Sequence, residues 1–337
     1  MKKIRIAQIG TSEYSHGHPV FRTLAECTDA FEIVGYALPE NEREKFPRQA
    51  AAFDGYREMT VEEILADETI DAVVVETEEI HLTKYAKMVV DAKKHLHMEK
   101  PGGLSMPDFL EMVNTAEKNG TVFHTGYMYR YNPVIAPLFE KIDRGELGDI
   151  VGVEAQMSCI HDDNFRAWQS TFPGCGMMYF LGCHLIDLVY RMQGEPKAVH
   201  SFFKCSGKGG IQAPDYTMAV LEYENGASFI KTTDVECGGF LRRQLVVTGT
   251  KGTVVVEPLE RVFEGDLLTT GHRTVTGEDW SSEGETVVSE PYHRYKAMML
   301  GFASYVRGEK KNPYGYEYER NLYKLLHRVC GLDKSDK

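Results

Sequence analysis

Short apolar runs alternate with amphipathic runs through residues 1–124, and this alternation limits the possible folds more than any other feature of the chain. The apolar runs predict strands over residues 4–9, 31–38, 71–75, 95–98 and 121–124. The segments between them have helical periodicity, as in residues 81–94. Strands that return through helices form βαβ units with a parallel sheet. The sequence therefore predicts an α/β fold whose first domain spans residues 1–124.

The pattern changes in residues 125–337, which we assign to a second domain because a chain of 337 residues exceeds the usual size of one domain. A helix is expected near residues 133–143. Alternating apolar and polar residues then predict strands over residues 150–157, 198–203, 217–223, 227–233 and 241–248. The turn signal Asn225-Gly226 favours antiparallel pairing. We expect an α+β domain with an open, largely antiparallel sheet.

Composition excludes several classes of partner. The 38 basic and 50 acidic side chains give a net charge of −12, which disfavours nucleic acid and anionic lipid surfaces. No apolar run approaches the roughly 18 residues of a membrane span, and the charged start leads directly into a strand, so we expect a cytoplasmic protein.

Seven scattered cysteines argue against disulfides. A zinc site built from Cys159, His161, Cys175, Cys183 and His184 matches no common ligand spacing, and we expect no metal.

The tripeptide Glu99-Lys100-Pro101 follows the strand at 95–98. In an open parallel sheet, ligands bind at the carboxyl ends of the strands, so Lys100 is placed at a ligand-binding edge. An ordinary solvated lysine at a strand end is the alternative. The first strand ends at the same edge, followed by Gly10, Thr11 and Ser12.

Four motifs together, in this order and spacing, resemble the Gfo/Idh/MocA (glucose–fructose oxidoreductase / inositol dehydrogenase) family. They are Glu99-Lys100-Pro101, Gly-Tyr-Met-Tyr-Arg-Tyr-Asn-Pro at 126–133, Gly-Glu-Leu-Gly at 145–148 and Gly-Cys-His-Leu-Ile-Asp at 182–187. The resemblance implies an N-terminal Rossmann domain that binds NAD(P), a sugar or polyol substrate, and a homodimer or homotetramer. It assigns Lys100 as the catalytic lysine and His184 as the proton-transferring histidine.

The chemistry of alcohol oxidation supports the same two residues. Loss of a proton from a hydroxyl requires a base with a pKa near neutrality, which histidine provides. A lysine ammonium beside the same oxygen would stabilise the developing negative charge. The alternative for His184 is a core histidine, because the segment 176–192 is an apolar, helix-like run. Helical spacing also permits an ion pair between Asp187 and Arg191.

The chain departs from the family pattern at several cofactor positions. The fingerprint G-x-G-x-x-G retains only Gly10, with Ser12 and Ser15 in place of the other glycines. Leu38 stands where an acidic residue normally binds the adenosine ribose, and the nearby Glu40 disfavours a ribose 2′-phosphate, so we favour NAD over NADP. The expected cofactor-binding residues are Gly10, Thr11, Ser12, Leu38, Glu76, Thr77, His81, Glu99, Lys100 and Met128. The acidic loop 76–79 would repel pyrophosphate, or is simply a solvated helix start.

The substrate side departs as well, because Phe180 replaces the aspartate that most family dehydrogenases carry four residues before the histidine. The expected substrate-binding residues are His161, Arg166, Trp168 and Phe180. Arg166 suits a carboxylate or phosphate and Trp168 the apolar face of a sugar, although a surface loop with one aromatic anchor is equally consistent.

The sequence therefore predicts an NAD(P)-dependent oxidoreductase that transfers a hydride to or from a hydroxyl carbon of a sugar, cyclitol or related polyol. Two alternatives remain. One is a non-catalytic NAD(P)-binding sensor of the same fold. The other is an enzyme that uses transient oxidation for elimination or glycoside cleavage.

Overall fold

The computed structural model describes residues 2–171, 176–277 and 279–333. The chain divides into two compact units, of which the first comprises Met1–Met128 and Tyr295–Tyr323 and the second Tyr129–Arg294 and Lys324–Lys337. The first unit thus includes residues 295–323, which the sequence analysis places in the second domain. Within the described ranges, no helix combines the length and the apolar character needed to cross a membrane.

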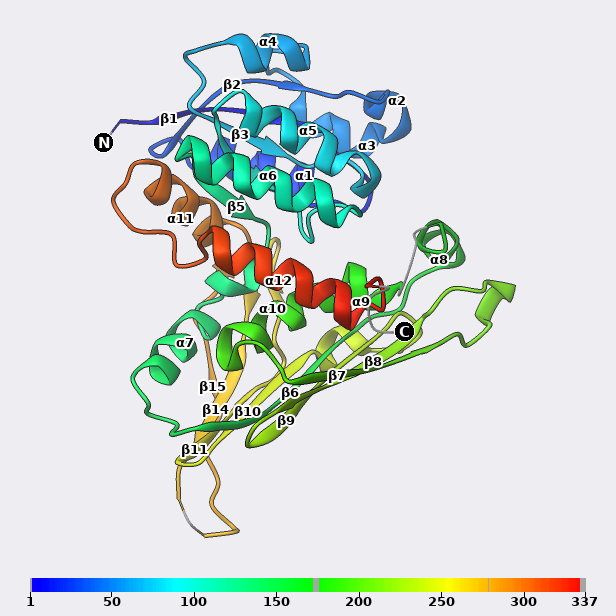
Figure 1. Ribbon diagram of the computed structural model, residues 1–337, viewed down its shortest axis with the longest axis vertical. Coiled ribbons are helices and arrows are strands. Elements are labelled where there is room, and N and C mark those ends of the chain that lie inside the picture. Colours follow the sequence, from blue (N-terminus) through cyan, green and yellow to red (C-terminus); the bar gives the residue numbers. More distant parts are fainter. Residues whose placement is uncertain (1, 172–175, 278, 334–337) are drawn as a thin grey trace. The chain divides into compact units, whose positions relative to one another are not determined.

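A five-stranded parallel sheet with the order β2-β1-β3-β4-β5 forms the centre of the first unit (Figure 1). Its strands are β1 (Ile4–Ile9), β2 (Phe31–Ala37), β3 (Ala72–Val75), β4 (His95–Met98) and β5 (Phe123–Thr125). Every residue of β3 is buried, as expected for a central strand covered on both faces. Strand β1 pairs with β2 on one side and with β3 on the other, so the order in which successive strands are added to the sheet reverses at β1. Open parallel sheets bind ligands at such a switch point. The predicted α/β fold is confirmed.

Helices connect these strands and cover the sheet. They are α1 (Gly17–Glu26), α2 (Glu42–Lys45), α3 (Pro47–Ala50), α4 (Val61–Ala66), α5 (Glu79–Asp91), α6 (Met106–Asn119), α11 (Lys296–Val306) and α12 (Tyr316–Val329). Local sequence explains their ends: Thr60 and Glu63 form a capping box at the start of α4, and Gly120 ends α6 with a left-handed φ of 67°. Helices α5 and α6 pack side by side (Figure 1).

The first part of α12 completes the first unit at the loop that follows β4. The Tyr323 hydroxyl donates to the Gly103 carbonyl at 2.7 Å, and its ring stacks on Phe109 with centroids 3.8 Å apart. Glu319 accepts a 2.9 Å hydrogen bond from the Thr125 hydroxyl. Residues of α12 therefore contact both the loop that follows Lys100 and the neighbouring strand β5, although they are distant in sequence from both.

The second unit is built on an eight-stranded sheet with the order β15-β14-β11-β10-β6-β9-β8-β7. Its strands are β6 (Ile150–Ser158), β7 (Ala198–Lys204), β8 (Tyr216–Tyr223), β9 (Gly226–Thr233), β10 (Gln244–Gly249), β11 (Gly252–Val256), β14 (Gly271–Val275) and β15 (Val287–Val288). Only β6 and β9 pair in parallel among these neighbours. A small sheet joins β12 (Arg261–Glu264), β13 (Leu267–Thr269) and β16 (Tyr292–His293). The predicted open, largely antiparallel sheet is confirmed.

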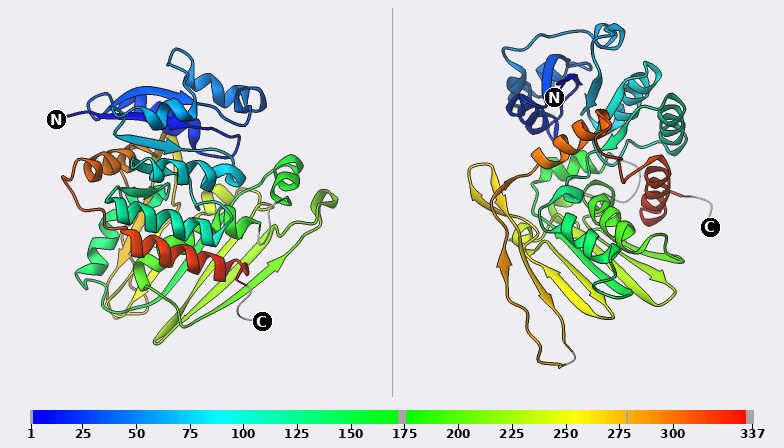
Figure 2. Two further views of the ribbon diagram at one scale, coloured as in Figure 1. Left: turned by 45° about the horizontal axis from the view of Figure 1, so that its top comes forward. Right: turned by 90° about the vertical axis from the view of Figure 1, so that its left-hand side faces the viewer.

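Four helices accompany this sheet in the described part of the second unit, and Figure 2 shows α7 and α10 on one face of it. They are α7 (Ile135–Asp143), α8 (Asp163–Gln169), α9 (Met177–Phe180) and α10 (Gly182–Gln193). The helical run expected over 176–192 is interrupted at Leu181. Gly182 permits close packing there, because a Cβ atom at this position would lie 3.0 Å from Thr232 Cγ2 of β9.

Asp187 of α10 forms an ion pair with Arg130, which lies outside the helix, whereas helical spacing alone pointed to Arg191. Arg130 Nη2 lies 2.7 Å from Asp187 Oδ1, and both side chains are fully buried. Arg191 instead pairs with Asp143 of α7 at the surface. Helical spacing permits a local pair between Asp187 and Arg191. A buried carboxylate, however, is stabilised by a cation buried beside it, and for Asp187 that cation is Arg130, from a different part of the chain.

Replacing Asp187 by alanine should lower the free energy of unfolding by about 3–5 kcal/mol, because Arg130 would remain charged and buried without its carboxylate. Urea denaturation of the full chain provides the measurement. The control is Asp143→Ala, which removes a half-exposed partner and should cost no more than about 1 kcal/mol. Equal effects of the two substitutions would contradict the assigned pairing.

Candidate functional site

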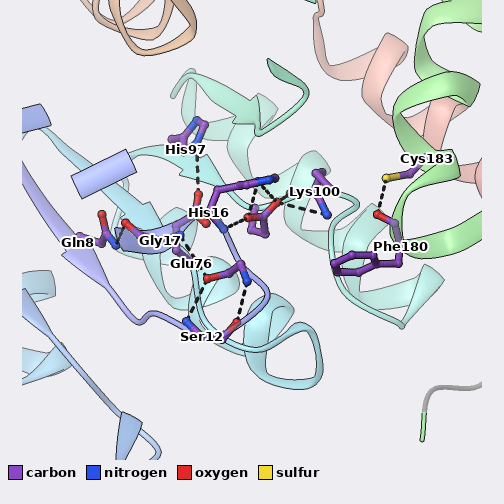
Figure 3. A network of polar contacts seen from close by, with 11 residues as sticks. Gln8, Ser12, His16, Gly17, Glu76, His97, Lys100, Phe180 and Cys183 are labelled. Atoms are coloured by element: carbon purple, nitrogen blue, oxygen red, sulfur yellow. Dashed lines mark hydrogen bonds and ion pairs between the residues drawn. The ribbon is translucent and has the colours of Figure 1, made fainter. Parts of the chain in front are cut away.

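The carboxyl edge of the parallel sheet brings together most of the predicted cofactor residues of the first unit, and Figure 3 shows Ser12, Glu76 and Lys100 among them. Three loops supply them, after β1, after β3 and after β4. The buried members are Gly10, Thr11, Ser12, Glu76, Thr77, Glu99 and Lys100. Residues separated by up to 90 positions in sequence thus form one cluster at the edge where a parallel sheet binds ligands.

Gly10 is required by the close approach of two of these loops. Its φ of +85° is left-handed, and a Cβ atom there would lie 2.3 Å from Thr77 Cγ2 and 2.9 Å from Thr77 Cα. The buried Gln8 amide donates to the carbonyl of Gly10 at 3.1 Å and to that of Gly17 at 3.0 Å (Figure 3). These contacts fix the path of the chain from β1 into α1.

The loop between β1 and α1 is longer than the G-x-G-x-x-G pattern implies, because α1 begins only at Gly17. The two serines at the fingerprint positions bind each other: Ser12 N donates to Ser15 Oγ at 3.0 Å, and Ser15 N donates to Ser12 Oγ at 2.9 Å. Ser15 Oγ also accepts from Gly17 N at 3.2 Å. The two hydroxyls therefore bind three backbone donors of this loop and fix its conformation.

His16, which the sequence analysis did not select, ties this loop to the lysine loop through Glu99. His16 N donates to Glu99 Oε2 at 2.6 Å, and its Nδ1 lies 2.9 Å from the same oxygen. Glu99 Oε1 accepts from Lys100 N at 2.9 Å and lies 3.9 Å from Lys100 Nζ (Figure 3). Burial opposes ionisation, but His16 and Lys100 outweigh it and hold the pKa of Glu99 well below its usual range.

The other glutamates at this edge behave differently. Burial raises the pKa of Glu76 well above its usual value, and it raises the pKa of Glu79 to about 7. Burial also lowers the pKa of His97, 3.5 Å from Glu76, to about 4. Glu78 forms an ion pair with Lys45 at 3.3 Å. Because burial disfavours the ionised form of Glu76 and Glu78 is paired with Lys45, the loop repels pyrophosphate less than its three glutamates suggested.

Leu38, His81 and Met128 lie apart from this hydrogen-bonded cluster. Leu38 lines a cavity of about 390 Å³ within the first unit, together with Met59, Lys84 and Tyr85. His81 lies 3.8 Å from Glu40. Met128 is buried at the start of a 3₁₀ turn, and no described contact joins it to the cluster.

Glu40 is held away from this edge by other partners. It accepts hydrogen bonds from Lys84 Nζ at 2.7 Å and the Tyr85 hydroxyl at 2.6 Å, and these bonds lower the pKa of Glu40 to about 2. The Glu40 carboxyl, two residues after Leu38, is therefore already bound by Lys84 and Tyr85.

In the second unit, His184 lies in a buried polar environment. Its ring contacts Tyr129 edge-to-face, with centroids 5.0 Å apart. The Tyr129 hydroxyl donates to Glu260 at 2.9 Å and accepts from Arg243 at 3.3 Å. Burial raises the pKa of Tyr129 above its usual value, so this hydroxyl remains protonated and neutral beside His184.

Three of the four predicted substrate residues join one aromatic cluster around Phe165. His161 stacks on Phe165 with centroids 3.7 Å apart, and Trp168 and Phe180 lie 5.4 and 5.3 Å from it. Phe180 and Trp168 also meet edge-to-face at 5.6 Å. Aromatic surfaces of this kind suit the apolar face of a sugar ring.

The fourth predicted substrate residue, Arg166, is buried although it lies in a short surface helix. Its Nη2 pairs with Asp163, whereas Nε and Nη1 have no hydrogen-bond partner in the described part of the chain. Asp234, at the end of β9, is fully buried, and both of its oxygens also lack a partner among the described residues. Burial and Asp215 raise the pKa of Asp234 to about 6, whereas Arg166 lowers it. Sequence reasoning missed Asp234, because no motif marks it.

The residues considered for a zinc site do not form one in the described part of the chain, where no three histidine, cysteine or acidic side chains are grouped for metal binding. Cys175 lies outside the described residues. Asp162 caps α8 by accepting a hydrogen bond from Phe165 N at 2.9 Å.

Comparisons with known proteins match both units. A family model described as "Oxidoreductase family, NAD-binding Rossmann fold" matches residues 4–127, and the GFO/IDH/MocA C-terminal domain matches residues 136–255. An uncharacterized oxidoreductase of Schizosaccharomyces pombe is 26% identical, covering 77% of this chain and 73% of that protein. The scyllo-inositol 2-dehydrogenase (NADP⁺) of Bacillus subtilis is 23% identical over 66% of this chain and 61% of that protein. A levoglucosan dehydrogenase, solved with NADH and levoglucosan, shares the fold with a TM-score of 0.79 at 18% identity. The similarity covers 97% of this chain and 96% of that chain.

Gly10→Ala should destabilise the chain and weaken dinucleotide binding, because the added methyl group would meet Thr77 at a left-handed position. We expect a loss of about 2–4 kcal/mol in the free energy of unfolding. Gly55→Ala is the matched control, since Gly55 has a φ of +86° but open space around its Cα. Urea denaturation compares the two variants, and a loss no larger than that of Gly55→Ala would show that the contact with Thr77 is unimportant.

The buried Glu79 should make the free energy of unfolding fall as pH rises. Its folded pKa, raised to about 7, exceeds the usual value of 4.5, so its stabilising contribution is complete below pH 4.5 and is lost as pH rises through 7. Glu79→Gln should remove a decline of about 3 kcal/mol between pH 5 and 8. Glu78→Gln, one residue earlier, should leave that decline in place. The free energy of unfolding is measured by urea denaturation at each pH. If it falls equally with pH in the wild type and in Glu79→Gln, this role of Glu79 is refuted.

Proposed function

Because the chain belongs to the Gfo/Idh/MocA family of oxidoreductases, whose N-terminal domain has the NAD-binding Rossmann fold, we propose that it transfers a hydride between a nicotinamide cofactor and a hydroxyl carbon of a sugar, cyclitol or related polyol. One observation carries the proposal. The buried Glu99 joins His16 and Lys100, and so fixes a lysine at the carboxyl edge of the parallel sheet.

The residues at this edge suit a dinucleotide. Gly10 removes the side chain where the β1–α1 loop must pass close to Thr77, and the loop leads into the positively polarised start of α1. In the proposed complex, Gly10, Thr11 and Ser12 contact the pyrophosphate, while Leu38 and His81 border the adenosine. The bound nicotinamide supplies the hydride acceptor or donor.

Lys100 and His184 divide the proton chemistry in this proposal. Lys100 donates a hydrogen bond to the reacting oxygen, and its positive charge stabilises the alkoxide character that develops there. Glu99 keeps the lysine oriented and its charge balanced within a buried site. His184 accepts the hydroxyl proton during oxidation and returns it during reduction.

Substrate recognition would rely on the aromatic cluster and on the buried polar atoms of the second unit. Trp168, Phe180 and His161 offer ring faces to apolar C–H surfaces, while Arg166 and Asp234 offer a donor and an acceptor to substrate hydroxyls. The names of two similar proteins, a scyllo-inositol 2-dehydrogenase and a levoglucosan dehydrogenase, support a polyhydroxy substrate.

Lys100→Met and His184→Gln should each lower kcat by at least about 100-fold, because the first removes the charge that stabilises the developing alkoxide and the second removes the base that takes the proton. NADH and NADPH binding is measured first by calorimetry, and turnover is then followed at 340 nm with a panel of sugars and cyclitols. Lys87→Met and His200→Gln are exposed controls and should retain activity.

Three outcomes would count against parts of this proposal. Failure to bind either cofactor refutes the oxidoreductase assignment. Cofactor binding without turnover of any substrate in the panel favours a sensor. Substrate consumption without net change in NADH favours transient oxidation followed by elimination or cleavage.

A further inference from the structure

A buried carboxyl that no sequence motif selects lies against the first amide of the β1–α1 loop. Glu42 Oε2 accepts a hydrogen bond from Thr11 N at 3.3 Å. Thr11 directly follows Gly10, the glycine that approaches Thr77. Glu42 is the first residue of α2, and its side chain is fully buried although helix starts after a strand usually lie at the surface.

The two residues before Glu42 adopt an unfavourable backbone conformation. Glu40 and Asn41 have φ values of 63° and 57°, in the left-handed region that non-glycine residues seldom occupy. Two such residues in succession cost free energy and persist only where surrounding structure or function requires them. The turn carries the chain from the end of β2 to Glu42.

Polar atoms around Glu42 lack partners within the described residues. Glu42 Oε1 and the Thr11 hydroxyl are both buried, and neither makes a hydrogen bond there. Buried oxygens are normally satisfied, because an unpaired one loses its hydration without compensation. A carboxyl oxygen accepts and a hydroxyl can donate or accept, so together they match a ligand with adjacent hydroxyl groups.

We propose that Glu42 is the residue that receives the adenosine ribose hydroxyls of the dinucleotide and selects NAD(H) over NADP(H). In Rossmann domains an acidic residue at the end of β2 has this role, but here Leu38 occupies that place and Glu40 is bound to Lys84 and Tyr85. Glu42 supplies the carboxyl from α2 instead. This inference rests on the proposed function, because it assigns one part of the same cofactor site.

The surrounding charges favour a ribose without a 2′-phosphate. The charged groups that face Glu42 are Glu40, Glu78 and Lys45, and the single cation among them is already paired with Glu78. A phosphate placed beside Glu42 would meet a predominantly acidic environment. Burial also raises the pKa of Glu42 to about 9, and hydroxyl donors from a ribose would favour its ionised form.

Glu42→Gln tests the proposal in the full chain, with Glu44→Gln as an exposed control on the same short helix. Calorimetric titration gives the dissociation constants of NADH and NADPH for each protein. We expect the wild type and Glu44→Gln to prefer NADH at least tenfold. In Glu42→Gln, NADH binding should weaken about tenfold and the preference should shrink toward unity, because the charged acceptor is lost.

A ligand pair makes the test independent of any folding defect in the variant. Wild-type protein is titrated with ADP-ribose and with its analogue that lacks the adenosine 2′-hydroxyl, and the analogue should bind about tenfold more weakly. Equal binding of the two, a preference of the wild type for NADPH, or identical behaviour of Glu42→Gln and Glu44→Gln overturns the inference and leaves the oxidoreductase assignment standing. Failure of the wild type to bind either NADH or NADPH overturns both.

Discussion

The ion pair of Glu99 with Lys100 is the interaction on which the first unit's candidate site depends. A charge that is removed from water is costly unless an opposite charge and hydrogen bonds compensate it. Both side chains are almost completely buried, so neither charge is stabilised by full hydration. His16 adds two further contacts to the same carboxylate. The position of Lys100 is therefore coupled to the path of the β1–α1 loop, so a cofactor that moves this loop would also act on the lysine.

The same rule explains why the acidic residues of this edge differ in charge. The pKa of Glu99 is held low because His16 and Lys100 face it, whereas Glu76, Glu79 and Glu42 have raised pKa values because burial dominates their surroundings. Counting acidic residues in the sequence therefore overstates the negative charge next to a bound pyrophosphate. The structure assigns full negative charge chiefly to the carboxylate that is balanced by Lys100.

The sequence predicted the architecture because periodicity and turn signals are local. The strands at 4–9 and 95–98 have the predicted bounds, and the other predicted strands differ by a few residues at their ends, whereas the strands from β11 to β16 were not predicted. Interactions between distant segments could not be predicted in this way. Asp187 is paired with Arg130 rather than with its helical neighbour, His16 with Glu99, and Glu42 with Thr11. Each partner is fixed by which side chains are buried together, and neither spacing nor composition reports that.

Phe180 shows how one substitution can redistribute recognition within the second unit. An aspartate at this position would supply a carboxylate one turn before His184, but Phe180 packs on Phe165 and Trp168 instead. The unit still contains a buried carboxyl, Asp234, whose oxygens have no partner among the described residues and which directly follows β9 rather than lying on the helix. Arg166 is close enough to lower the pKa of Asp234, and it has unpaired nitrogens of its own within the described residues. In our interpretation, aromatic contacts replace the missing aspartate at the helix, while the polar recognition of hydroxyl groups comes from Arg166 and Asp234.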